Sequence, residues 1–181
     1  GFHPQRQERR NKAVISRAGP TELIPRKCRT TRSLPYMAIA ARGDAFVQYE
    51  TNFLALVDKV DDRVLISING GSHLGFAEEG KWFRWFDHPD AIGCSFAIDT
   101  IERDKASTEP WYDELGSVEA GYVQEIDPVL CENIPASAIN PLRQQQITLM
   151  AVRSFLACQF SADPADRTRW CTYLGEAFER E

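Results

Sequence analysis

The sequence predicts an α/β fold in which helices cover a parallel sheet. Two short segments, 34–41 and 63–68, are apolar almost throughout, and a helical pattern lies between them. Strands of this kind are typical of parallel sheets covered on both faces, whereas strands with one wet face alternate apolar and polar residues. A strand, a helix and a second strand in this order form a βαβ unit. The predicted unit spans residues 34–76.

Each element of this unit has its own signal. The first strand, "LPYMAIAA", is entered through Pro35, which is tolerated at the first residue of a strand. The second strand, "RVLISI", ends at the glycine pair Gly70 and Gly71. Between the strands, apolar residues recur at spacings that place them on one face of a helix: Tyr49, Phe53, Leu56, Val57 and Val60.

The remaining segments are interpreted as a connector, an insertion and two terminal helices. Residues 1–33 are polar and basic, and "NKAVISRA" within them is predicted to be a short helix. Residues 81–138 indicate an insertion or lid-like region, with one short strand at "GYVQEI". Asn140 followed by Pro141 predicts a helix start. Residues 140–181 therefore hold two helices, the first buried against the sheet because its second half is apolar nearly all round.

Composition places the chain among ordinary single-domain globular proteins. Its 181 residues are 43% hydrophobic and 26% charged, with a formal net charge of -5. That charge gives no general attraction to phosphate backbones, so we predict no nucleic-acid partner and interpret "RQERRNK" as a solvated face. No apolar run reaches the roughly 20 residues that cross a bilayer, so no membrane span is predicted.

Five cysteines allow two interpretations. None are spaced as C-x-x-C, which disfavours a zinc site or a dithiol redox motif, and we predict no metal and no cofactor. In a secreted or periplasmic protein, Cys94 would pair with Cys131 and Cys158 with Cys171, which leaves Cys28 free or bonded to other sequence. In a cytoplasmic protein all five would be reduced and packed as small hydrophobes. The sequence favours neither interpretation over the other.

Two titratable residues follow the two predicted strands. Asp44 comes after the first strand and His73, within "NGGSHLGF", after the second. The carboxyl ends of adjacent parallel strands meet at one edge of a sheet, where functional residues collect. A carboxylate there can accept the Nδ1 proton of the imidazole, which leaves Nε2 to take a proton from a nucleophile. We therefore predict that Asp44 and His73 form a catalytic pair.

The segments that carry this pair resemble a known family. "LPYMAIAARGDAFVQYE" and "VLISINGGSHLGF" look like the strands and loops that deliver the acid and the histidine in the carboxyl-terminal half of α/β-hydrolase serine esterases. They are most similar to dienelactone-hydrolase-like, platelet-activating-factor-acetylhydrolase-like and polyester-hydrolase-like members. The resemblance covers residues 34–76 and, less specifically, the helix from Asn140. It implies an α/β-hydrolase fold and hydrolysis of a carboxylic-ester substrate, with Asp44 as the acid and His73 as the base.

One part of that family's machinery is missing from the sequence. The nucleophilic serine of the family lies in G-x-S-x-G ahead of the acid, and the chain contains no such motif there. The nearest spelling surrounds Ser95, which follows the histidine and is interpreted as structural, while Ser72 is predicted to hold the histidine's loop. We expect residues 1–181 to be the carboxyl-terminal portion of one α/β-hydrolase domain. The serine would then lie upstream or on a complementary N-terminal chain, an expectation with which the abrupt start at Gly1 agrees.

Aromatic residues after the histidine are candidates for substrate binding. We predict that Phe76, Trp82 and Phe83 contact the substrate, with "KWFRWF" as an acyl pocket or lid; packing of part of this cluster into the core is the alternative. His88, which lies between Asp87 and Asp90, is interpreted as part of a solvated turn rather than a metal site. The alternative function for the whole chain is a non-catalytic α/β binding or interaction domain.

Overall fold

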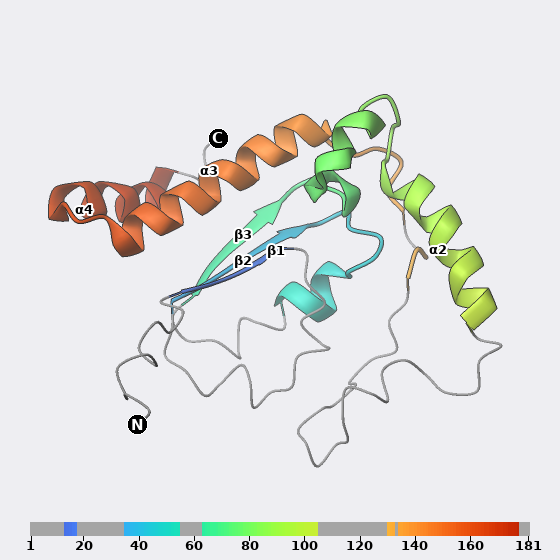
Figure 1. Cartoon of the computed structure of the whole chain (residues 1–181), viewed down its shortest axis with the longest axis horizontal. Helices are drawn as coiled ribbons and strands as arrows, with labels where there is room; N and C mark the ends of the chain where they lie inside the picture. Colours follow the sequence, from blue (N-terminus) through green and yellow to red (C-terminus); the bar gives the residue numbers. More distant parts are fainter. Residues whose placement is uncertain (1–12, 18–34, 55–62, 105–129, 133, 178–181) are drawn as a thin grey trace, which may run out of the picture.

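A computed structural model describes residues 13–17, 35–54, 63–104, 130–132 and 134–177. Along these ranges the strands come first, with a helical turn between the second and the third, and only helical elements follow (Figure 1). The strands are β1 (Val14–Arg17), β2 (Tyr36–Ala41) and β3 (Arg63–Ile68), and the α-helices are α2 (Asp90–Asp104), α3 (Pro141–Phe160) and α4 (Pro164–Thr172). Short helical turns occupy Tyr49–Phe53 (η3), Leu74–Phe76 (η5), Glu78–Phe83 (η6) and Tyr173–Ala177 (η9).

The three strands form one parallel sheet in the order β1-β2-β3. Tyr36 of the central strand is the partner of Val14 in β1 and of Arg63 in β3, and both pairings continue in parallel register. The predicted α/β class and parallel sheet are confirmed. β3 has the predicted bounds, and β2 begins two residues later than predicted, directly after Pro35.

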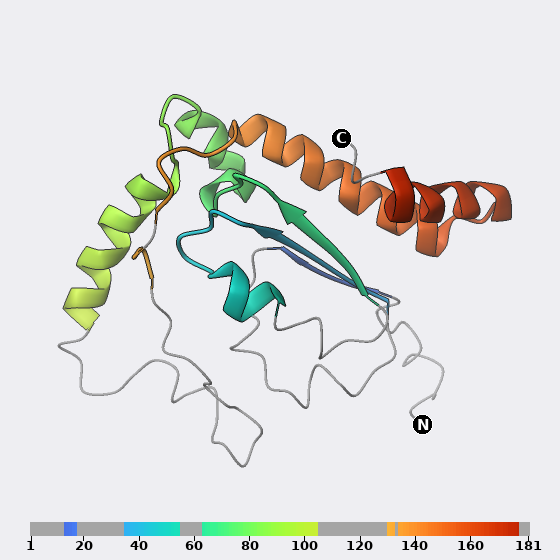
Figure 2. The ribbon, with the colours of Figure 1, turned by 180° about the vertical axis from the view of Figure 1, so that it is seen from behind.

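Both faces of the sheet are covered, which explains why β2 is apolar at every position (Figures 1 and 2). Successive side chains of a strand point to opposite faces. Met37, Ile39 and Ala41 pack on the α3 side with Ala151 and Phe155, whereas other residues of β2 pack against η3 on the opposite side. Burying each large apolar side chain in these two layers contributes about 1.5–3 kcal/mol. The residues on the η3 side are Ala38, Ala40, Phe53, Tyr36, Tyr49 and Leu65.

The first strand corrects the sequence prediction. "NKAVISRA" was expected to contain a short helix, but Val14–Arg17 is strand β1. The amide of Val14 donates to the carbonyl of Pro35 at 2.9 Å, and the parallel pairing with β2 follows from there. Val14 and Ile15 are β-branched and suit a pleated surface. Pairing with a strand about twenty positions later decides the conformation, and a local reading of the sequence cannot detect it.

The region interpreted as an insertion contains a helix that the sequence pattern did not predict. Residues 90–104 form the 15-residue helix α2. Gly93 lowers the local helix propensity, yet it has a packing reason, because a Cβ at this position would lie 2.9 Å from the Phe46 ring and 3.0 Å from Leu74. Glycine therefore allows α2 to approach the loops that follow β2 and β3.

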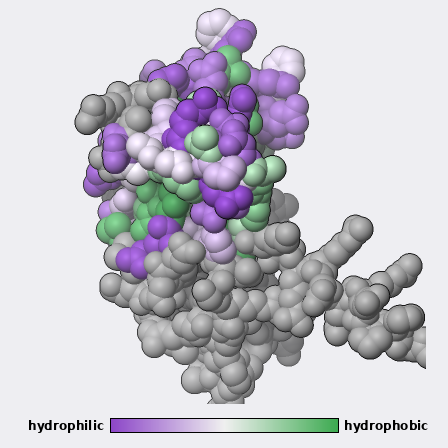
Figure 3. All heavy atoms as spheres, turned by 90° about the vertical axis from the view of Figure 1, so that its left-hand side faces the viewer, coloured by the Kyte–Doolittle hydropathy of each residue, from purple (hydrophilic) through white to green (hydrophobic). Residues whose placement is uncertain are grey.

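The two terminal helices begin as the sequence indicates. Asn140 accepts the amide of Leu142 at 2.9 Å and Asp163 accepts that of Ala165 at 3.0 Å, so each helix has a side-chain N-cap followed by proline. A disulfide between Cys158 and Cys171 joins α3 to α4. Seen from the α4 end, the described surface is largely hydrophilic (Figure 3).

Helix α3 is buried against the sheet, as predicted, but only one of its sides is buried. Ala151, Phe155 and Cys158 face the interior, but Leu149 is 67% exposed and Phe160 is 44% exposed. The sheet lies along one side of this helix, and none of the described strands covers the opposite side (Figure 2). Apolar residues on that opposite side raise the hydrophobicity of the sequence without entering the core.

Several predictions fall outside the described residues. These are the second half of the helix predicted from Tyr49, with Leu56, Val57 and Val60, the strand at "GYVQEI" and the state of Cys28. Tyr49 and Phe53, which belong to the described part of that helix, lie on one face with their ring centroids 5.0 Å apart. Among the described helices, none combines the length and the hydropathy that a bilayer span requires.

Candidate active site

Two loops meet at the carboxyl ends of β2 and β3. We call residues 42–47 the acid loop and residues 69–77 the histidine loop. The amide of Arg42 donates to the carbonyl of Ile68 at 3.0 Å, and the amide of Gly43 donates to that of Gly71 at 3.0 Å. The hydrogen-bond ladder of the sheet thus continues beyond both strand ends and holds the loops side by side.

Asp44 and His73 are brought together by these loops. Oδ2 of Asp44 lies 3.0 Å from Nδ1 of His73, and the Asp44 side chain is 2% exposed. Oδ1 accepts the amides of Phe46 and Val47 at 2.9 and 2.8 Å. Because the carboxylate is an acceptor, it favours the proton on Nδ1 and leaves Nε2 as the nitrogen that can exchange protons. The predicted contact is present.

The environment of the imidazole adjusts its basicity. The ring is 32% exposed and packs 5.0 Å from the Phe46 ring, centroid to centroid. Its burial lowers the pKa of His73, but the hydrogen bond and charge of Asp44, together with the charge of Asp90, outweigh it and raise that pKa above 6.5. Nδ1 is the ring nitrogen that faces Asp44, so Nε2 lies on the other side of the ring. A proton acceptor is thus available at the surface of the described structure.

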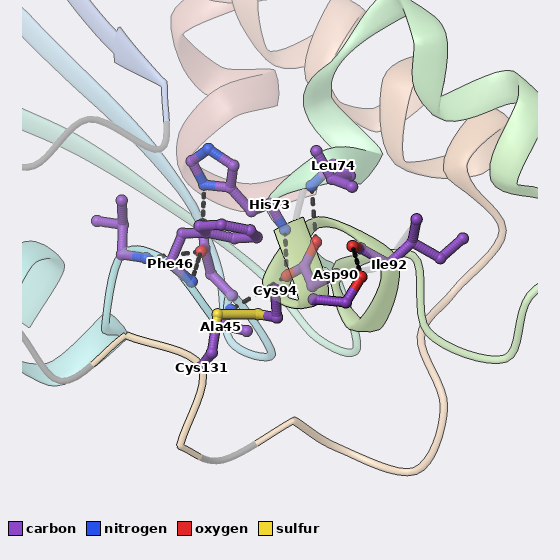
Figure 4. Close-up of a disulfide and its surroundings, with 11 residues drawn as sticks. Ala45, Phe46, His73, Leu74, Asp90, Ile92, Cys94 and Cys131 are labelled. Carbon is purple, nitrogen blue, oxygen red and sulfur yellow. Dashed lines mark hydrogen bonds and ion pairs between the residues drawn. A yellow bond between two sulfur atoms is a disulfide. The ribbon is translucent and has the colours of Figure 1, made fainter. Parts of the chain in front are cut away.

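Asp90 joins the two loops and was missed as a site residue. Its fully buried carboxylate accepts the amides of His73 and Leu74 at 2.8 Å each and that of Ala45 at 3.1 Å (Figure 4). Three amide donors satisfy a buried charge that would otherwise be costly. The only sequence signal for Asp90 is "HPDAIG", in which an aspartate follows proline at a helix start. In sequence, an aspartate that accepts amides of other segments cannot be distinguished from an ordinary helix cap.

Gln144 of α3 is a second residue that sequence reasoning missed. Its Oε1 accepts the amide of Ser72 at 2.9 Å and its Nε2 donates to the carbonyl of Ser72 at 2.7 Å. Both residues are fully buried. The side-chain amide thus satisfies the backbone next to the histidine as a neighbouring strand would. Gln145 adds a bond from its Nε2 to the carbonyl of Ala77 at 2.6 Å.

A disulfide lies directly behind the acid loop. Cys94 of α2 is bonded to Cys131, as the two-disulfide interpretation predicted (Figure 4). The amide of Cys131 donates to the carbonyl of Ala45 at 2.7 Å. Ala45, the residue after the acid, is therefore held through its amide by Asp90 and through its carbonyl by Cys131.

The prediction for His88 is wrong. It was placed in a solvated turn, but it is 5% exposed, and among the described residues neither of its ring nitrogens has a hydrogen-bond partner. A Cβ added at Gly43 would lie 3.4 Å from Nε2 of His88, so this ring lies beneath the acid loop. Pro89 and Asp90 beside it are also fully buried. The tight contact of α2 with the loops removes this segment from water.

The aromatic candidates divide into two environments. Phe76 is 6% exposed and belongs to the core cluster on the α3 side, which argues against the predicted contact with substrate. Trp82 is 71% exposed, and Phe83 is partly exposed, with its ring centroid 6.3 Å from that of Phe86. Core packing of "KWFRWF" is also wrong for Trp82, Trp85 and Phe86, all of which are exposed.

The two serines near the histidine are bonded to the backbone. The hydroxyl of Ser72 accepts the amide of Gly75 at 3.1 Å, so it holds the histidine loop as predicted. The hydroxyl of Ser95 donates to the carbonyl of Ile92 at 2.7 Å within α2. Both bonds agree with the structural roles predicted for these residues.

Other features of the described residues lie apart from the pair. No group of three or more His, Cys, Asp or Glu side chains within them could hold a metal ion. A hollow of about 560 Å³ lies between β3 and α3, lined by residues that include Ile66, Arg143 and Met150. Neither Asp44 nor His73 lines it, so the hollow is separate from the candidate site.

No protein-family model, no curated protein and no solved structure matches this chain. We therefore infer a function from the geometry of the two loops.

Proposed function

We propose that this chain is the acid–base part of a serine-dependent carboxylic-ester hydrolase with an α/β-hydrolase fold. The observation that carries the proposal is the 3.0 Å contact between Asp44 and His73, located where adjacent parallel strands end. A serine hydroxyl attacks the ester carbonyl while Nε2 of His73 takes its proton and later returns it to the leaving alkoxide. Asp44 orients the ring and stabilises the imidazolium, and water repeats the cycle on the acyl-enzyme.

The nucleophile is supplied by sequence upstream of this chain or by a separate chain. The absence of G-x-S-x-G ahead of Asp44 supports this part of the proposal. So does strand β1, which is an edge of the described sheet and leaves Val14 and Ile15 each 37% exposed. Parallel sheets are normally buried, so a further strand beside β1 would complete the sheet and bring the serine's segment to its carboxyl edge.

Substrate contacts and location follow from the same proposal. Trp82 and Phe83 offer partly or fully exposed aromatic surface in the segment after the histidine loop, which suits the apolar part of an ester. Two disulfides among the described residues support a secreted or periplasmic protein over a cytoplasmic one.

A fluorophosphonate probe tests the proposal, because it labels only an activated serine. The native protein, isolated with all its chains, should be labelled on a serine outside residues 1–181. A His73→Ala variant should lose both labelling and ester hydrolysis, whereas Ser72→Ala and Ser95→Ala should keep the label. Retained turnover in His73→Ala would refute the catalytic role of the histidine.

The rival function is a non-catalytic α/β-hydrolase-like binding or interaction domain. The observation that favours it is that residues 1–181 contain no G-x-S-x-G ahead of Asp44, so the pair has no nucleophile elbow within this chain. Under this alternative the native protein takes up no probe on any serine, and His73→Ala changes no enzymatic rate.

A further inference from the structure

The acid loop and the histidine loop come from different strands, and their relative position decides whether Asp44 and His73 can touch. The backbone bond between Gly43 and Gly71 joins the loops on the strand side. Beyond it, the amino-terminal end of α2 contacts both loops through Asp90, its first residue.

Asp90 contacts the loops at the residues adjacent to the pair. One of its oxygens accepts both the amide of His73 and the amide of Ala45, which directly follows Asp44, while the other accepts the amide of Leu74. The carboxylate is fully buried, so no water replaces these bonds at low cost. Moving either loop breaks a charge-assisted hydrogen bond in the interior.

Helix α2 is itself held against the acid loop. Cys94 lies four residues after Asp90, about one helical turn along, and its disulfide partner Cys131 donates an amide to the carbonyl of Ala45. A ring of contacts therefore runs from Ala45 to Asp90, along the first turn of α2 to Cys94, across the disulfide to Cys131 and back to Ala45.

We propose that Asp90 is a positioning residue that holds Asp44 and His73 in register, and that the Cys94–Cys131 disulfide keeps α2 in the place from which it does so. This inference rests on the proposed function only for the expected changes in enzymatic rate. The geometry of the pair can be followed without activity.

The main test is proton NMR of His73 in the complete protein. Strong hydrogen bonding of Nδ1–H to Asp44 should give a downfield proton signal, and Asp90→Asn should weaken or remove it. The charged groups that act on the ring are Asp44 and Asp90, so the same variant should also lower the pKa of His73. Asp87→Asn, an exposed site three residues away, is the matched control and should change neither property.

A second experiment removes the disulfide and changes no charge. It therefore distinguishes the effect of the position of α2 from the effect of the charge of Asp90. Replacing Cys94 and Cys131 by alanine should weaken the downfield signal, while replacing Cys158 and Cys171, which join α3 to α4, should leave it intact. If the hydrolase proposal also holds, Asp90→Asn should lower kcat roughly 10- to 100-fold with little change in KM, as expected for a small displacement of the reacting groups.

The inference is overturned if Asp90→Asn and the Cys94/Cys131 variant both fold and keep the signal at its original position and intensity. If Asp90→Asn does not fold, the Cys94/Cys131 variant and its Cys158/Cys171 control test the inference instead, because both keep Asp90. Amide exchange in the unaltered protein gives an independent check: Ala45, His73 and Leu74 should exchange slowly as a group, and rapid exchange of all three would contradict the bonds to Asp90. An NMR result as expected, together with absent esterase activity, would retain this inference and reject the proposed function.

Discussion

Nδ1 of His73 lies 3.0 Å from Oδ2 of Asp44, although 29 positions separate the two residues. The other oxygen of Asp44 accepts two amides of its own loop, so the carboxylate is already oriented when the ring approaches. The imidazole can therefore keep one orientation and one tautomer while its second nitrogen changes protonation. This is the arrangement that a general base requires.

Removing the charge of Asp44 should disable the pair. In Asp44→Asn the side-chain amide no longer stabilises the imidazolium and can present a donor to Nδ1, so we expect kcat for ester hydrolysis to fall about a thousandfold or more. The pKa of His73 should fall as well, because the largest influence that raises it is the bond to Asp44. Steady-state kinetics and an NMR titration measure the two effects. Asp166→Asn on α4, which loses only a surface ion pair with Arg169, should change neither.

The pair should make stability depend on pH in a defined window. The pKa of His73 is raised above 6.5 in the folded protein, so the folded state binds the proton more tightly than the unfolded chain does. The resulting stabilisation is fully present below the unfolded value of 6.5 and is lost as pH rises through the higher folded value. The difference in unfolding free energy between the original protein and His73→Gln should be larger at about pH 6 than at about pH 9. Urea titrations that give equal differences at the two pH values would contradict this.

The kcat/KM for ester hydrolysis should follow the same group. A general base must be neutral to accept a proton, so kcat/KM should rise with pH through the folded pKa of His73, which lies above 6.5. The test is a pH–rate profile measured with a chromogenic ester. An apparent pKa below 6.5 for the acid limb of that profile would be inconsistent with His73 as the base.

Gln144 should contribute strongly to the stability of the fold, because its side chain bonds both backbone groups of Ser72. Gln144→Leu leaves both the amide and the carbonyl of buried Ser72 without their partners, which should cost about 3 kcal/mol of unfolding free energy. Gln146→Leu makes the same chemical change at an exposed position two residues later and should alter the free energy little. Chemical denaturation of the two variants measures the contrast, and equal effects would show that Gln144 holds nothing specific.

Gly43 should tolerate no side chain. A Cβ there would lie 2.8 Å from the carbonyl oxygen of Gly71, the atom that accepts the Gly43 amide, so Gly43→Ala must separate the two loops. We expect a loss of stability and of the downfield signal from Nδ1–H of His73. Gly175→Ala, where a Cβ meets nothing within 4 Å, serves as the control and should be neutral or slightly stabilising. A stable Gly43→Ala protein with an intact signal would show that the loops are not in tight contact.

The sequence predicted the parts of this fold whose signals are local. Segment 63–68 is apolar almost throughout and is soon followed by the glycine pair, so its bounds agree with β3, and Asn140 with Pro141 marks the start of α3. The order of Asp44 and His73 after two consecutive strands also follows from the chain, because parallel strands place their carboxyl ends at one edge. The contact of the pair could therefore be predicted without coordinates.

The tertiary structure alone decided the features that depend on partners distant in sequence. Strand β1 exists because its backbone pairs with β2, and α2 can pack against both loops because Gly93 leaves room for Phe46 and Leu74. Asp90 and Gln144 are ordinary polar residues in the sequence. They support the site only because the fold buries them beside backbone amides of the histidine loop, to which they are hydrogen-bonded. A hydrogen bond between residues 72 positions apart leaves no periodic trace in the chain, because its cause is the packing of two elements and not the properties of either segment.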